Sequence, residues 1–114
     1  MAKYLVLYKS TATVAEQMAV AQTDPAAATA AMELWGQWAA RAGDALLDIG
    51  TPLTDVGSVP EGSGGGGLHI GGYSILQADS AAAATGLLAG HPHFHAPGAS
   101  IEVLEYLAMP GAGA

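Results

Sequence analysis

The sequence predicts a single α+β domain with the βαββαβ element order of a ferredoxin-like fold. Four runs rich in β-branched, aromatic and leucine residues indicate strands, and segments with apolar residues at helical spacing lie between them. The chain of 114 residues has the size of one ordinary domain, so residues 1–114 are taken as one unit. This order predicts a four-stranded antiparallel sheet with both main helices on one face.

The first half of the chain carries one strand and the strongest helix pattern. Residues 3–8 (KYLVLY) indicate a first strand, and their apolar side chains on both faces favour a central place in the sheet. The capping-box sequence that begins at Thr13 predicts a short helix to about residue 22. Asp24 and Pro25 predict the start of the main helix, as its N-cap and first residue, and Gly43 predicts its end.

Three further strands are expected in the second half of the chain. Residues 45–49 indicate the second strand and residues 68–78 the third. Gly71 and Gly72 interrupt the third strand, which predicts a bulge or a close approach of another backbone there. Residues 101–107 indicate the last strand.

The remaining segments connect or end these elements. Asp79 and Ser80 are expected to cap a second, alanine-rich helix to about residue 89, with Asp79 as the N-cap partner. Residues 55–67 are rich in glycine, which is costly to order, so we expect a mobile loop. This loop lacks the Lys-Ser/Thr pair of a phosphate-binding loop and leads into a strand, so that interpretation is rejected. Residues 109–114 are expected to fray.

The charge balance excludes two classes of partner. The net charge is −7, and the only fixed cations are Lys3, Lys9 and Arg41. Nucleic acids and anionic membranes are bound by clusters of Lys and Arg, which these three residues do not form. There is no Cys, so disulfides and thiolate metal sites are excluded. Without a signal peptide pattern or a long apolar segment, we expect a cytoplasmic protein.

The face of the sheet opposite the helices needs a cover. Candidates to line that face are Leu5, Leu7, Ile75, Leu104 and Tyr106. Only 11% of the residues are charged, which is low for the surface of a monomer. We therefore expect a homodimer in which two sheets pack face to face.

Four stretches carry a resemblance to a known family: residues 3–8 (KYLVLY), 71–80 (GGYSILQADS), 90–93 (GHPH) and 101–105 (IEVLE). On these stretches the chain resembles the YCII-related (YciI-like) proteins over nearly its whole length. The resemblance implies a dimeric α+β barrel, in which two four-stranded sheets face each other. The wider fold superfamily includes monooxygenases and isomerases.

One departure from that family concerns its active site. Better-studied members carry a His at the start of the main helix, paired with an Asp, but residues 26–32 here contain no His. Three histidines instead fall in the connector at His91, His93 and His95. Imidazole suits proton transfer and metal ligation near neutral pH. The alternatives are a surface loop that caps the preceding helix, a small-ligand or proton-transfer site, and a metal site.

Other candidate residues come from the strands. Asp48 interrupts an apolar strand and is the best carboxylate candidate. Tyr73 and Ser74 are candidate hydrogen-bond partners for a ligand. His69, beside the glycine-rich loop, either faces a cleft or is a hydrogen-bonded strand residue.

We therefore expect a cleft, associated with the dimer, that binds a small organic molecule without a cofactor or metal. Catalysis is left open: His91 and His93 would carry protons and Asp48 would orient them. We expect both histidines to lie at the surface, where their loss would leave the fold intact. The alternative is a non-catalytic binding or accessory protein that keeps the family fold. Trp35 and Trp38 are assigned to helix packing.

Overall fold

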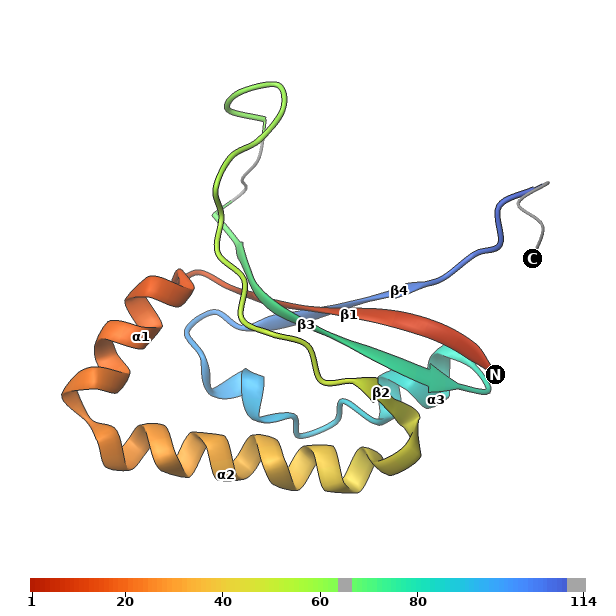
Figure 1. The fold of residues 1–114 in the computed structure, drawn as a ribbon, viewed down its shortest axis with the longest axis horizontal. Helices are drawn as coiled ribbons and strands as arrows, with labels where there is room; N and C mark the ends of the chain where they lie inside the picture. Colours follow the sequence, from red (N-terminus) through yellow and green to blue (C-terminus); the bar gives the residue numbers. More distant parts are fainter. Residues whose placement is uncertain (64–66, 111–114) are drawn as a thin grey trace.

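A computed structural model describes residues 1–63 and 67–110 as a four-stranded antiparallel sheet with helices on one side (Figure 1). The strands are β1 (Ala2–Ser10), β2 (Leu46–Asp48), β3 (His69–Ala78) and β4 (Ser100–Glu105). The predicted mobile loop at 55–67 and the predicted fraying tail at 109–114 each fall partly outside the described residues, at 64–66 and 111–114.

The strand order is β2-β3-β1-β4, and every neighbouring pair is antiparallel. β1 lies at the centre, as its two-sided apolar pattern predicts, because Val6 pairs with Ser74 on β3 and with Val103 on β4. The register of β1 and β3 shifts at Gly71, so the predicted irregularity at the glycine pair is confirmed.

Local signals set both ends of the N-terminal helices. Helix α1 (Val14–Thr23) begins with the predicted capping box, in which the Thr13 hydroxyl accepts from the Glu16 backbone N–H at 3.1 Å. Helix α2 (Pro25–Ala42) begins after Asp24, whose side chain accepts from Ala27 N–H at 3.1 Å. Gly43 ends α2 at a φ of 56°, a region that favours glycine.

The second half of the chain departs from the predicted boundaries. Helix α3 (Ala81–Gly86) is shorter than the alanine pattern predicts, and the turn after it is irregular. Its N-cap is Ser80, whose hydroxyl accepts from Ala83 N–H at 3.1 Å, so the assignment of Asp79 as N-cap is wrong. Two short 3₁₀ turns, η1 (Gly43–Ala45) and η2 (Pro92–His95), complete the fold.

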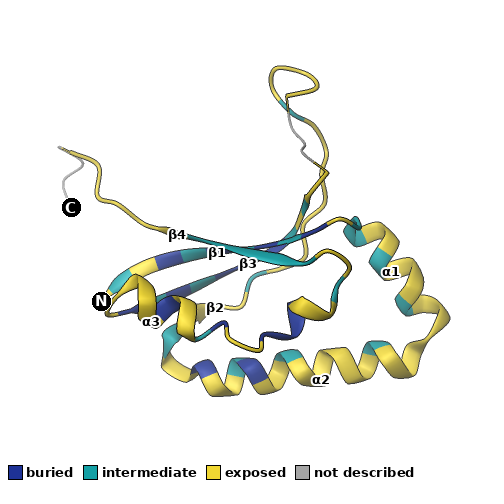
Figure 2. Cartoon of the chain, turned by 180° about the vertical axis from the view of Figure 1, so that it is seen from behind, coloured by how far each residue is buried: buried dark blue, intermediate teal, exposed yellow. Residues whose placement is uncertain are grey.

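The main core lies between the sheet and α2. On β1, Val6 and Tyr8 point toward the helices and are buried, and Leu76 on β3 lies beside them. Trp38 of α2 is 1% exposed, and its indole N–H donates to the Leu87 carbonyl at 2.8 Å. Figure 2 shows buried residues on β1, β3, α2 and the connector between α3 and β4. The predicted packing role of Trp38 is confirmed.

The opposite face of the sheet carries apolar side chains that no described helix covers. Leu5 pairs with Ile75 and with Leu104, so these three residues form an apolar row across β3, β1 and β4. Next to this row, Lys9 forms an ion pair with Glu102. The predicted strand end at residue 107 is wrong: β4 stops at Glu105, and the exposed Tyr106 lies beyond it.

Among the described residues, none of the helices has the length and apolar character needed to cross a membrane.

Candidate functional site

The histidine connector lies inside the domain, between the sheet and α2 (Figure 1). His91 is 1% exposed and His93 is 8% exposed, so the expectation of a surface loop is wrong for both residues. Pro92 is buried and begins the 3₁₀ turn η2, so the connector follows neither an extended path, which would set the rings on one face, nor a polyproline-like path, which would splay them. His95 is exposed and does not join the other two.

His91 is enclosed by aromatic rings. Its ring centroid lies 4.9 Å from that of Tyr8, 4.6 Å from that of Trp35 and 4.3 Å from that of Trp38. The His91 Nδ1 accepts a hydrogen bond from the backbone N–H of His93 at 2.9 Å, while its buried Nε2 has no partner in the described residues. Burial, with smaller contributions from His93 and Arg41, lowers the pKa of His91 to about 4. The imidazole is therefore neutral, with its proton on Nε2.

Of the two buried histidines, His93 is the one that lines a cavity. Its Nε2 lies 2.7 Å from the Lys9 carbonyl oxygen, which can only accept, so Nε2 carries the proton. Burial lowers the pKa of His93, although hydrogen bonding to the carbonyls of Lys9 and Ser100 acts in the opposite direction. The Nδ1 of this neutral tautomer is an acceptor.

A hydrogen-bonded chain links the C-terminal end of β1 to the segment after β2. The Tyr8 hydroxyl lies 2.7 Å from Ser74 Oγ, and Ser74 donates to the Ile49 carbonyl at 2.7 Å. Burial raises the pKa of Tyr8 to about 12, so its phenol stays protonated. Ser74, a predicted ligand-binding residue, is fully buried, and its side chain forms a hydrogen bond with the Tyr8 hydroxyl.

Next to Tyr8 and His93 is a cavity of about 320 Å³ between α1, α2 and the ends of β1 and β3. That volume is within the range of small-molecule sites. None of the described residues that line the cavity is charged. Its lining includes Tyr8, Val14, Gln17, Met32, Trp35 and His93.

The glycine pair of β3 keeps this cavity open. A Cβ atom on Gly71 would lie 3.0 Å from Val14 Cγ2, and one on Gly72 would lie 3.4 Å from the Thr51 carbonyl oxygen. A larger side chain at Gly71 would meet α1, and one at Gly72 would meet Tyr8 and the segment after β2. The glycines therefore remove side-chain volume where the cavity meets the sheet.

Asp48 and the Tyr73 side chain lie on the other face of the sheet from the two buried histidines, although Tyr73 also contributes to the cavity lining. The Tyr73 hydroxyl donates to Asp48 Oδ2 at 3.4 Å, and Asp48 Oδ1 accepts from Gly50 N–H at 2.8 Å. Asp48 is exposed and shapes the turn after β2. Its contacts do not bring it to His91 or His93, as an orienting carboxylate would require.

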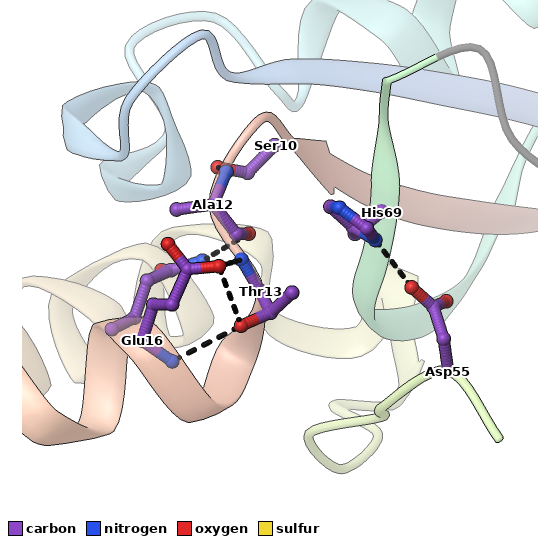
Figure 3. A network of polar contacts seen from close by, with 7 residues as sticks. Ser10, Ala12, Thr13, Glu16, Asp55 and His69 are labelled. Carbon is purple, nitrogen blue, oxygen red and sulfur yellow. Dashed lines mark hydrogen bonds and ion pairs between the residues drawn. The ribbon is translucent and has the colours of Figure 1, made fainter.

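The Nδ1 atom of His69 forms a hydrogen bond with the Asp55 carboxylate near the start of β3 (Figure 3). Both side chains are partly exposed, and the pair lies across from Ser10 at the end of β1. This arrangement matches the interpretation of His69 as a hydrogen-bonded strand residue.

Within residues 1–63 and 67–110, no three His, Asp or Glu side chains lie close enough together to hold a metal ion. The His91 ring instead accepts from the His93 backbone N–H, and the His93 ring donates to the Lys9 carbonyl.

Sequence reasoning missed most of the cavity lining. Tyr8 was taken only as a strand residue, and Trp35 only as a packing residue, although Trp35 also lines the cavity. The available signals were Gly71 and Gly72, which leave room beside a strand, and Ser74, a buried polar residue that needs a partner.

Comparison of the chain with protein-family models, curated proteins and solved structures found no match.

Proposed function

We propose that this protein binds a small, uncharged, largely apolar organic molecule in the cavity between α1, α2 and the sheet. The observation that carries this proposal is the composition of the cavity wall: it has aromatic and aliphatic side chains, a few polar groups and no charged residue among those described. A charged ligand would lose its hydration there without gaining an opposite charge. An apolar ligand would gain by leaving water.

Catalysis is the second candidate, and one observation favours it. His93 lines the cavity and is neutral at physiological pH, so it could accept a proton from a ligand without a cofactor. Against this role, the Nε2 of His93 is held by the Lys9 carbonyl, and Asp48 lies on the opposite face. We therefore favour binding over acid–base chemistry.

The strand order supports a further proposal about the assembly. We propose that the domain is ferredoxin-like, belongs with the YCII-related proteins, and forms a dimeric α+β barrel. The order β2-β3-β1-β4 with antiparallel pairs is consistent with a split βαβ arrangement. The apolar row of Leu5, Ile75 and Leu104 would be covered by the same row of a second copy.

Ligand binding can be tested with a thermal-shift screen of uncharged aromatic and aliphatic metabolites, followed by titration of any hit. Val14→Phe should fill the cavity and weaken binding by at least about ten-fold. Val20→Phe is the matched control, because Val20 lies on the exposed side of the same helix and does not line the cavity. Equal loss of binding in both variants, or a screen with no hit, would contradict the proposal.

The assembly can be tested by light scattering at micromolar concentration. The wild-type chain should scatter as twice its mass of 11.3 kDa. Leu7→Asp on the open face of the sheet should give monomers that keep their circular dichroism, since an unpaired charge is costly in an apolar interface. A wild-type monomer would refute the dimer and leave the ligand proposal standing.

A further inference from the structure

The direction of one hydrogen-bonded chain determines what the Tyr8 hydroxyl can offer a ligand. Ser74 has a single hydroxyl hydrogen, and it donates that hydrogen to the Ile49 carbonyl at 2.7 Å. The oxygen of Ser74 can therefore only accept from Tyr8, across the 2.7 Å that separates the two hydroxyls. The hydrogen of Tyr8 is committed to Ser74, and its oxygen keeps only acceptor capacity.

His93, which also lines the cavity, is likewise limited to accepting a hydrogen bond from a ligand. His93 donates its Nε2 hydrogen to the Lys9 carbonyl, so the other ring nitrogen is an acceptor. Tyr8 and His93 are thus both acceptors toward anything else that approaches them. A ligand that carries only acceptors would place its own lone pairs against the lone pairs of the Tyr8 oxygen and the His93 nitrogen.

Ser74 joins the Tyr8 hydroxyl to the Ile49 carbonyl, and Tyr8 is itself part of the cavity lining. Ile49 itself lines the cavity, as does Trp35, whose ring meets that of Tyr8 edge to face at a centroid distance of 5.0 Å. A flat ring bound against Trp35 would gain aromatic contact and could direct a substituent toward the hydroxyl oxygen.

We propose that the cavity selects an uncharged aromatic molecule that donates a hydrogen bond to the Tyr8 oxygen, of which a phenol is the simplest example. This inference rests on the proposed function and adds the chemical class of the ligand. Selection arises because burial makes an unmatched polar group costly, so a ligand without a donor forfeits the bond and also leaves the Tyr8 oxygen without a partner.

The test compares three probes of nearly equal shape: 2-naphthol, which donates, 2-methoxynaphthalene, which does not, and 2-acetylnaphthalene, which only accepts. Binding is followed by ¹H–¹⁵N correlation spectra of the full chain, in which the amides of Gly71 and Gly72 report on the cavity. We expect the naphthol to bind about five- to ten-fold tighter than the ether, the worth of one hydrogen bond.

Three variants assign that preference to the hydroxyl. Tyr8→Phe should bind naphthol and ether equally. Tyr4→Phe should keep the wild-type preference, since Tyr4 is a buried residue on the same face of β1 that does not line the cavity. Ser74→Ala releases the Tyr8 hydrogen, so 2-acetylnaphthalene should gain several-fold in affinity over its binding to wild type.

The outcomes separate this inference from the function on which it rests. Equal binding of naphthol and ether to the wild-type chain, with shifts at Gly71 and Gly72, would overturn the donor rule and leave ligand binding in place. A preference that survives Tyr8→Phe would also overturn it. Failure of all three probes, together with an empty thermal-shift screen, would overturn both proposals.

Discussion

The buried imidazole of His91 should make the stability of this domain strongly dependent on pH. His91 has a pKa lowered to about 4 from the ordinary 6.5, chiefly because it is packed among Tyr8, Trp35 and Trp38. In the unfolded chain the same imidazole titrates at its ordinary value. Between these two values the unfolded chain binds a proton that the folded domain does not, so lowering the pH favours unfolding.

The size of the effect follows from the two pKa values. His91 contributes about 3 kcal/mol to the free energy of unfolding. This contribution is fully present above pH 6.5 and is lost as the pH falls toward 4. About 2 kcal/mol of this should be lost by roughly pH 5, before most carboxylates titrate. The pKa of His93 is lowered as well, so its contribution has the same sign.

The assay is urea unfolding near pH 7 and near pH 5, with wild type compared with His91→Asn. Asparagine keeps an acceptor for the His93 N–H but gives up the ring contacts, at a cost of about 2 kcal/mol near pH 7. The variant should lose much less stability than wild type on acidification. His95→Asn is the control, since His95 is exposed in the same connector and should leave the pH dependence intact. Equal wild-type stability at both pH values would refute the argument.

Three further predictions concern backbone conformation and helix capping. Gly50→Ala should cost more than about 3 kcal/mol in thermal unfolding, because its Cβ would lie 1.8 Å from the Tyr73 carbonyl oxygen at a φ of +83°. Gly36→Ala, inside α2 with no atom within 4 Å of the new Cβ, should instead stabilise by about 0.5–1 kcal/mol, and a loss there would contradict the helix geometry. Ser80→Ala should cost about 1 kcal/mol as a lost N-cap, whereas Asp79→Ala should change stability by less than about 0.5 kcal/mol; the reverse order in denaturant titrations would restore Asp79 as the cap.

The elements that could be predicted from the sequence are those with local causes. The capping box at Thr13 and the Asp24-Pro25 start of α2 each depend on residues within one helical turn. The bulge at Gly71 and the central place of β1 also follow from composition that is visible in the strand itself. Such signals need no knowledge of the rest of the chain.

The candidate site could be predicted only in part, because its contacts join distant segments. His91 and His93 were selected correctly as unusual residues, but their burial depends on α2 packing over η2, which no pattern in the connector reveals. Tyr8 meets Ser74 through a strand pairing that spans 66 residues of sequence. The alternation of side chains along a strand shows that Asp48 and the histidines lie on opposite sides of the sheet, but only once the pairing of the strands is known.

The strand order also has a consequence for how the chain folds. The central strands β1 and β3 are neighbours in the sheet, yet α1, α2 and β2 lie between them in sequence. Closing so long a loop costs entropy before any sheet contact repays it, and domains dominated by such contacts fold slowly. The 18 residues of α2 can form early from local contacts, whereas the cavity takes shape only when the ends of β1 and β3 meet. A ligand of the cavity should therefore leave the rate of the main folding step nearly unchanged when it is added during refolding. The same ligand should slow the unfolding of the folded domain.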